Sequence, residues 1–299
     1  MAVLAIAFAL ASCTEVDLWD EVAIPHRADV SLTVSDGFAS DSTLFVAHRL
    51  FVPADTAVTV SGTSATLKDI VTGDYKFYAL SLDRSTYSYG KSVDSLLTLV
   101  ADTTGHKVPM VKSIFKDNII VSFKPYSWNK NSWASVKNSL ELSGDFINPE
   151  ANAVYCDSTL LVTLEPSVAS NVKLSEHSCL TTNFTVSFAI SAHRDITNYN
   201  VYCVIPNVGY AVDLQKNVDY SQNYQALVKM SPKKDGETYT YTGEFNAFGV
   251  TPGTMDIYVC NGTTPITLDD DKHTSIGASF TVNLRDSKIK ASGTVLTIN

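Results

Sequence analysis

The sequence predicts an all-β protein with two tandem β-sandwich domains. Three observations support this prediction: the composition, short alternations of apolar and polar residues, and turn sequences between them. Of the 299 residues, 32 are Ser and 30 are Thr, whereas only 14 are Gly and 10 are Pro. Thr, Val and aromatic side chains suit the pleated surface of a sheet, so this composition favours strands. The length fits two domains of ordinary size.

Apolar and polar residues alternate most clearly in four segments. These are residues 30–34, 184–190, 238–242 and 280–284. Because successive side chains of a strand point to opposite faces, each segment is expected to bury one face. On that basis Phe280, Val282 and Leu284 should share a buried face. Residues 75–82 are apolar at nearly every position, which predicts a central strand buried on both faces.

The alternation breaks between residues 125 and 149. Within this stretch Trp133, Val136 and Leu140 have helical spacing and Gly144 follows as a stop signal, so a helix is expected over residues 132–142. We therefore place the domain boundary near residue 150. The predicted domains are residues 28–150 and 151–299.

The N-terminus has the pattern of an export signal. Residues 2–11 are all apolar and are followed by Ser12 and Cys13. Residues 10–13, Leu-Ala-Ser-Cys, resemble a bacterial lipobox, in which the cysteine sulfur is acylated and the chain is cut before it. We predict a lipoprotein signal peptide over residues 1–12, lipidation of Cys13 and an acidic tether over residues 13–27. The alternative is a plain signal peptide with an incidental cysteine.

The basic residues that usually precede such an apolar core are missing. We therefore expect the true translation start to lie several residues upstream.

Four further cysteines, Cys156, Cys179, Cys203 and Cys260, leave two alternatives. They are buried free thiols that act as small apolar side chains, or they form disulfides by one of three possible pairings. Their spacing does not indicate a zinc site.

The charge and the motifs exclude several classes of function. The net charge is 22 − 31 = −9 with no basic run, which argues against nucleic acid as a partner. Residues 90–92, Gly-Lys-Ser, lack the first glycine of a phosphate-binding loop, so no nucleotide is expected. The acidic run 269–271 beside His273 is interpreted as a solvated loop and not as a metal site. We predict no catalytic residues, no metal and no cofactor, and hence no enzyme.

Three aromatic residues, Tyr126, Trp128 and Trp133, crowd into a polar stretch. Aromatic rings flanked by amides stack on sugars, so a glycan or partner contact is one interpretation. The other is that their large area pins a loop or an interdomain contact.

Taken together, three stretches resemble the fimbrillin-like lipoprotein family of Bacteroidota, particularly its minor and anchoring subunits of the FimB/Mfa type. They are the lipobox with its acidic tether, residues 71–80 around a Gly-Asp-Tyr sequence, and residues 242–249 followed by the strand-like 255–260. The resemblance implies two transthyretin-like, Greek-key β-sandwich domains. Residues 107–149 match the family least.

The resemblance also implies a function. The chain would be a non-catalytic lipoprotein of the outer membrane, exposed at the cell surface, that acts as a fimbrial anchor or minor subunit. Its partners would be other fimbrial subunits, joined by strand exchange, and the membrane, reached through the acyl anchor. Subunits of the fimbrial shaft are cut after an arginine, and Arg27 is the candidate here for proteolytic processing.

The C-terminal segment 293–299 would belong to the joint with the next subunit, or it is an ordinary closing strand. The alternative function is a surface glycan-binding lipoprotein of a polysaccharide-uptake system.

Overall fold

The computed structural model is nearly all β, which confirms the predicted fold class. It describes residues 26–36, 38, 42–50, 55–91, 97–101, 107–111, 119–128, 132–193, 195–268 and 274–298. Within these ranges the one helix is α3 (Ser132–Ser139), close to its predicted position. No helix of the described ranges is long and apolar enough to cross a membrane.

The chain folds into two compact units, and their bounds differ from the predicted boundary at residue 150. Among the described residues, the first unit comprises those within 26–81 and 156–178, and the second comprises those within 82–155 and 179–298. The difference arises because the chain crosses between the units more than once. Pairing between segments far apart in sequence leaves no signal in local periodicity.

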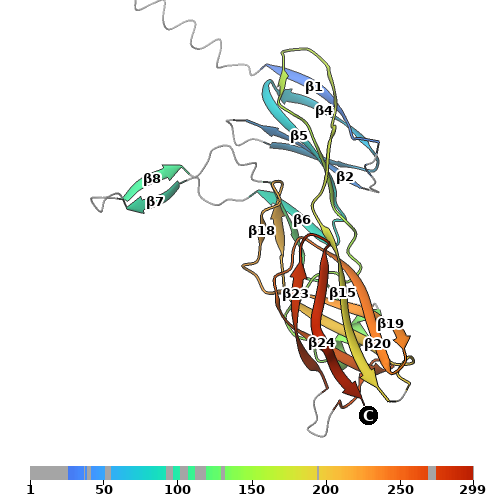
Figure 1. The fold of residues 1–299 in the computed structure, drawn as a ribbon. Coiled ribbons are helices and arrows are strands. Elements are labelled where there is room, and N and C mark those ends of the chain that lie inside the picture. The colour runs from blue at the N-terminus through green and yellow to red at the C-terminus, as the bar shows by residue number, and fades with distance from the viewer. Residues whose placement is uncertain are drawn as a thin grey trace, which may run out of the picture. The chain divides into compact units, whose positions relative to one another are not determined.

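The first unit has two sheets. One has the strand order β13-β1-β4, and the other has the order β14-β11-β5-β2-β3, with β12 also paired to β5 (Figure 1). The bounds are β1 Arg27–Thr33, β2 Thr43–Arg49, β3 Asp55–Val60, β4 Ser64–Val71, β5 Gly73–Ser81, β11 Tyr155–Ser158, β12 Val162–Leu164, β13 Ser170–Lys173 and β14 Glu176–Cys179.

Burial in the first unit follows the sequence pattern. Val30, Leu32 and Val34 are buried at alternate positions, as predicted for this segment. Strand β5 is central and mostly buried, also as predicted, because β2 pairs on one side and β11 and β12 pair on the other.

The second unit is built around a ring of seven strands. The order β19-β16-β21-β23-β24-β15-β20 closes because β20 also pairs with β19. The bounds are β10 Asp145–Phe146, β15 Thr182–Ala192, β16 Asn200–Val208, β19 Tyr224–Asp235, β20 Thr238–Ala247, β21 Gly253–Asn261, β22 Thr264–Pro265, β23 Ile276–Asn283 and β24 Lys288–Ile298. Strand β10 extends this sheet beside β19, and β22 pairs with β21.

Strand β19 closes the ring by changing neighbours halfway. Residues 224–230 pair with β16, and residues 231–235 pair with β20. At this bend a Cβ on Gly243 would lie 2.7 Å from Val228 Cγ1 and 2.9 Å from the Lys229 carbonyl oxygen. The glycine in the family-like stretch 242–249 therefore permits close approach of two backbones.

Strand β16 is apolar on both faces because α3 covers its outer side. Tyr202 and Val204 form a buried cluster with Val136 and Leu140 of α3, together with Phe146, Leu227 and Cys260. The opposite side of β16 contributes Val201, Cys203 and Ile205, which are fully buried. The continuous burial of this strand therefore has two separate causes.

The remaining strands form two small sheets. Four of them have the order β18-β17-β9-β6, and the other two, β7 and β8, pair with each other. Their bounds are β6 Tyr87–Lys91, β7 Leu97–Ala101, β8 Lys107–Val111, β9 Ile119–Phe123, β17 Ala211–Asp213 and β18 Val218–Asp219.

One position departs from the predicted alternation. Leu284 was expected on the buried face of its strand, but it is 73% exposed. The reason is that β23 ends at Asn283 and residues 284–287 form a turn into β24. The alternation of apolar residues continues one step beyond the strand itself.

Candidate functional site

The C-terminal strand β24 has two halves with different surroundings. Residues 288–291 pair with β23 on one side, and residues 288–290 pair with β15 on the other. Residues 294–298 pair with β15 alone, in parallel, and no partner is present on the β23 side within the described residues. The pairing with β15 shifts register twice near Ala189, and Gly293 has a positive φ of 70°. The second half of β24 therefore presents a free strand edge.

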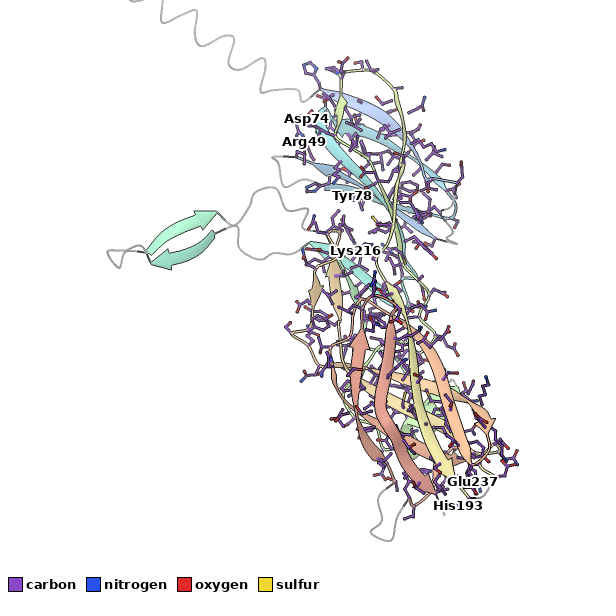
Figure 2. All side chains as sticks on the ribbon, in the orientation of Figure 1. Arg49, Asp74, Tyr78, His193, Lys216 and Glu237 are labelled. Carbon is purple, nitrogen blue, oxygen red and sulfur yellow. The ribbon has the colours of Figure 1, made fainter. Side chains whose placement is uncertain are left out.

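The far end of β24 is hydrogen-bonded to the residue that follows β15. The backbone N–H of His193 donates to the Ile298 carbonyl oxygen at 3.0 Å. Beside it, the side chains of His193 and Glu237 lie 3.4 Å apart and are both mostly exposed (Figure 2). An exposed pair of this kind adds little stability. The end of β24 is held by its pairing with β15 and by the buried side chain of Ile298.

Arg27, the candidate processing residue, is the first residue of β1. It pairs with Val71 of β4, and its carbonyl oxygen accepts a hydrogen bond from the Ser167 N–H at 3.1 Å. Its guanidinium donates to the Asp69 carbonyl oxygen at 2.7 Å and to the Asp69 carboxylate at 3.2 Å. Ala28, on the other side of the candidate bond, is 4% exposed. A protease must bind its substrate as an unpaired extended segment, so cleavage here requires β1 to separate from β4.

The three aromatic residues pack against the buried cluster that α3 forms with β16. Tyr126, Trp128 and Trp133 are all half-buried against this cluster. Tyr126 meets Trp128 edge-on, and the Trp133 Nε1–H donates to Glu150 Oε1 at 3.1 Å. The ammonium of Lys137 lies over the Trp128 ring at 5.4 Å from its centroid. Packing accounts for all three positions, and contact with a glycan stays a prediction.

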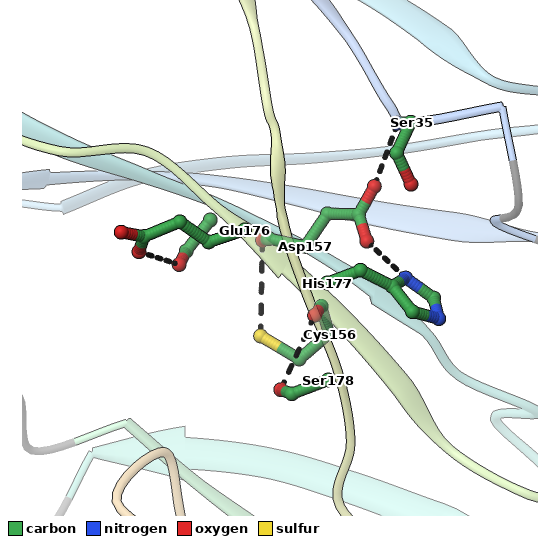
Figure 3. Close-up of polar contacts among 7 residues, drawn as sticks. Ser35, Cys156, Asp157, Glu176, His177 and Ser178 are labelled. Carbon is green, nitrogen blue, oxygen red and sulfur yellow. Dashed lines mark hydrogen bonds and ion pairs between the residues drawn. The ribbon is translucent and has the colours of Figure 1, made fainter.

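Sequence reasoning missed a polar cluster in the first unit. Asp157 of β11 is fully buried, and its Oδ1 lies 2.6 Å from His177 Nδ1 on β14 (Figure 3). Its Oδ2 accepts a hydrogen bond from the Ser35 backbone N–H at 2.7 Å. The two residues stand twenty positions apart in ordinary strand sequence, so no spacing indicated the contact.

The described contacts of Ser35, Ser158 and Ser178 do not form a catalytic triad with His177 and Asp157. Ser35 approaches Asp157 through its backbone N–H, and its hydroxyl oxygen is buried without a hydrogen-bond partner. The neighbouring hydroxyls of Ser158 and Ser178 bond to Glu176 and to the Cys156 carbonyl oxygen, not to His177. We interpret the cluster as a clamp that ties the turn after β1 to β11 and β14.

The four described cysteines are free thiols, so the first of the two alternatives holds. Cys156, Cys203 and Cys260 are buried, and Cys179 is half-buried. Burial raises the pKa of the Cys260 thiol to about 11, and it raises the pKa of Cys203 above its ordinary value as well. Both therefore stay protonated at neutral pH and are poor nucleophiles.

Some of the other sequence features lie outside the described residues, and one that resembled a loop belongs to a strand. Cys13, the signal peptide and the acidic run 269–271 with His273 lie outside. Residues 90–91 of the near-miss phosphate loop belong to strand β6, where Gly90 pairs with Ile120. Within the described ranges no group of His, Cys, Asp and Glu is arranged to hold a metal ion.

Comparison with known proteins identified similar solved structures only. No family model matches the sequence, and no curated protein matches it. A "putative adhesin" from Bacteroides ovatus ATCC 8483 has 11% identity and a TM-score of 0.46, covering 94% of this chain and 97% of that one. The fimbrial anchor protein Mfa2 from Porphyromonas gingivalis has 8% identity and a TM-score of 0.41, covering 78% of each chain.

A further similar structure is described as "putative polysaccharide binding proteins" from Bacteroides thetaiotaomicron VPI-5482. It has 12% identity and a TM-score of 0.37, covering 88% of this chain and 78% of that one. Proteins described as adhesins and fimbrial proteins of Bacteroidota are thus among the structures to which this chain is similar. Since these TM-scores are below 0.5, the function is inferred from the chain's own residues.

Proposed function

We propose that this chain is a non-catalytic lipoprotein of the outer membrane that acts as a fimbrial anchor or minor subunit at the cell surface. The observation that carries the proposal is the free edge of β24. Within the part of the chain that the structure describes, residues 294–298 are paired on one side only. An unpaired edge can accept a strand from a neighbouring subunit, and a terminal strand can also leave to be donated.

The position of Arg27 favours the anchor over a processed shaft subunit. The Arg27 carbonyl is hydrogen-bonded to Ser167, and Ala28 is buried. A folded chain therefore resists cutting at this bond and keeps its connection to Cys13. An acylated Cys13 would then hold the base of the assembly in the membrane, as expected when more than one acyl chain is attached.

Truncation tests the assembly role. Deleting residues 295–299 is expected to abolish recruitment of the partner subunit, measured by co-purification from outer membranes, while the first unit stays folded. The matched control is Leu284→Ser, which changes an exposed residue of the same unit outside the strand. Normal recruitment by the truncated chain would contradict strand addition at β24.

A disulfide lock then distinguishes a strand that leaves from one that stays. Ser191 of β15 and Thr297 of β24 are register partners, so Ser191→Cys with Thr297→Cys places two thiols opposite each other. β24 could be donated to the next subunit, or it could fill the acceptor groove only until a partner's strand replaces it. In either case the oxidised disulfide blocks recruitment and reduction restores it. If β24 stays and accepts a strand on its free edge, the oxidised protein recruits its partner normally.

The anchor is tested separately. With the full native signal, Cys13→Ala is expected to move the protein from the detergent phase to the soluble fraction. Mass spectrometry of the surface-extracted protein should find an acylated N-terminal Cys13. An N-terminus at Ala28 would instead identify a processed, polymerising subunit.

A further inference from the structure

Exposed apolar side chains are concentrated in one segment of the first unit. Of the five large apolar residues exposed among the described residues, three lie within nine positions: Leu160 at 74%, Leu161 at 58% and Val168 at 49%. The segment 160–169 contains a single charged residue, Glu165. Isolated exposed leucines are ordinary, whereas a local concentration marks a surface that contacts something apolar.

The backbone on both sides of these residues is held in place. The Thr159 N–H donates to the Phe77 carbonyl oxygen at 3.1 Å, and Val162 begins the pairing of β12 with β5. The same pairing buries Leu164 at 2% exposure. Leu160 and Leu161 therefore lie in a short connection between β11 and β12 whose two ends are fixed by hydrogen bonds to β5.

The segment lies where the chain arrives from the predicted lipid anchor. Its Ser167 N–H bonds to the Arg27 carbonyl oxygen, and the His26 carbonyl oxygen accepts from the Thr72 N–H at 2.8 Å. Residues 167–169 line an open cavity of about 220 Å³ together with residues 27–29 and Asp69. In Figure 1 this part of the chain, coloured yellow-green, arches beside the start of β1.

Chain length favours the bilayer as the occupant. Cys13 precedes His26 by thirteen residues, which span at most about 45 Å when fully extended. A surface tethered so closely meets the membrane at a high effective concentration, so weak apolar contacts are sufficient. We propose that residues 160–169 form a membrane-contact surface, which holds the first unit against the bilayer that anchors Cys13. The inference rests on the proposed acylation.

The polar groups around the cavity are already paired with each other. The Asp69 carboxylate lies 3.2 Å from the Arg27 guanidinium, and Asp29 Oδ1 accepts from the Asp69 N–H at 2.8 Å. Arg27 is the one cation among the residues that line the cavity, and Asp69 neutralises it. The contact is therefore expected to be apolar and insensitive to salt, because no unpaired cation of the cavity is left to bind lipid phosphates.

A polarity-sensitive dye measures the contact. The full acylated chain is placed in phosphatidylcholine vesicles with the dye on Leu161→Cys, and Leu284→Cys in the second unit is the matched control. A Cys179→Ser background removes the half-buried thiol, and the other described cysteines are buried. We expect a blue shift and quenching by a lipid-borne quencher at position 161, with neither at position 284.

A second variant tests the same surface without the tether. In the unacylated Cys13→Ser protein, the triple change Leu160→Ser, Leu161→Ser and Val168→Thr should lower the vesicle partition coefficient by at least about tenfold, because three aliphatic side chains lose their burial. Leu284→Ser should leave it unchanged. All of these positions are exposed, so the variants are expected to fold.

The outcomes separate the contact from the anchor. If the acylated protein binds vesicles but the dye at 161 behaves like the dye at 284, the membrane-contact proposal is overturned. If the acylated protein does not bind vesicles, the anchor fails, and a hexahistidine in place of Cys13 on nickel-chelating lipid tests the contact alone. A dye response that requires added partner subunit would make the segment a protein-docking surface and overturn the proposal.

Discussion

The two units are stabilised in different ways. The second unit closes seven strands into a ring, and its inner face is filled by aliphatic and aromatic side chains. The first unit consists of two open sheets assembled from separate stretches of chain, with a buried carboxylate on β11 that contacts both β14 and the turn after β1. Open sheets keep edges and a ring has few. The break in the ring's pairing along β24 is therefore the informative exception.

The difference suggests a division of roles. Among the described residues, the first unit carries three of the five exposed large apolar side chains, and it also carries the link to the predicted anchor. The second unit carries the terminal strand with its free edge. Membrane contact and assembly would then reside on separately folded parts, so each can be impaired without the other.

Removing one buried ring from each unit tests their independence. Phe184 of β15 stacks on Phe245 with the ring centroids 5.8 Å apart, and Phe77 of β5 stacks on Tyr75 with the centroids 5.6 Å apart. Each Phe→Ala change is expected to destabilise its own unit by about 3–5 kcal/mol, because a large cavity replaces the ring. Calorimetry should show two transitions, with a different one lowered in each variant. A common shift would show that the units unfold together.

The buried clamp is expected to have the next largest effect. His177→Ala leaves Asp157 with one partner in a buried site, which should destabilise the first unit by about 2–3 kcal/mol. The control is His193→Ala in the second unit, whose pair with Glu237 is exposed on both sides. It should change stability by at most about 0.5 kcal/mol. Equal effects in denaturant titrations would remove the distinction between clamp and surface pair.

Gly243 of β20, which faces the bend of β19, is expected to have the third largest effect. Gly243→Ala would place a methyl group 2.9 Å from the Lys229 carbonyl oxygen and is expected to cost about 1–2 kcal/mol. Gly277 of β23 is the matched control, since its nearest neighbour would be a Thr254 methyl group at 3.2 Å. Thermal melts should show a clear loss for Gly243→Ala and little change for Gly277→Ala. Equal melting temperatures would exclude close backbone approach as the reason for the glycine.

Strands with one buried face were predictable from sequence because their signal is local. The alternation of Phe184, Val186 and Phe188 predicts which face of β15 is buried, and these three side chains are buried in the structure. The same rule failed at Leu284 because alternation does not report where a strand ends.

Non-local features could not be predicted in this way. Residues 82–155 belong to the second unit because they pair with distant residues of that unit, as Ser122 does with Ala211. Such pairs are far apart in sequence. The partnership of Asp157 and His177 likewise needs the fold to bring two strands together. The glycine of the 242–249 stretch was recognised as a resemblance, but its reason appeared only with the bend in β19.

The smallest expected effect on stability is that of Asp83, whose side chain lies near the start of the second unit and can be titrated with acid. Asp83 precedes β6, and its carboxylate accepts hydrogen bonds from the Ser85 hydroxyl and N–H and from the Thr86 hydroxyl at 2.7–2.9 Å. Partial burial acts to raise the Asp83 pKa, but these bonds outweigh it, so the pKa lies below its ordinary value of 3.8. A lowered pKa means that the folded state favours the charged carboxylate.

The sign of the pH dependence follows from this shift. The stability that Asp83 contributes is present above pH 3.8 and is lost as the pH falls through its lower folded-state pKa. Asp83→Ala should therefore melt below the parent protein at pH 7, by an amount worth less than about 1 kcal/mol because the site is largely exposed. The gap should narrow as the pH approaches 2 and protonation removes the charged acceptor from both states of the parent. A gap that is constant from pH 7 to pH 2 would show that Asp83 stabilises the turn by shape alone, not by its charge.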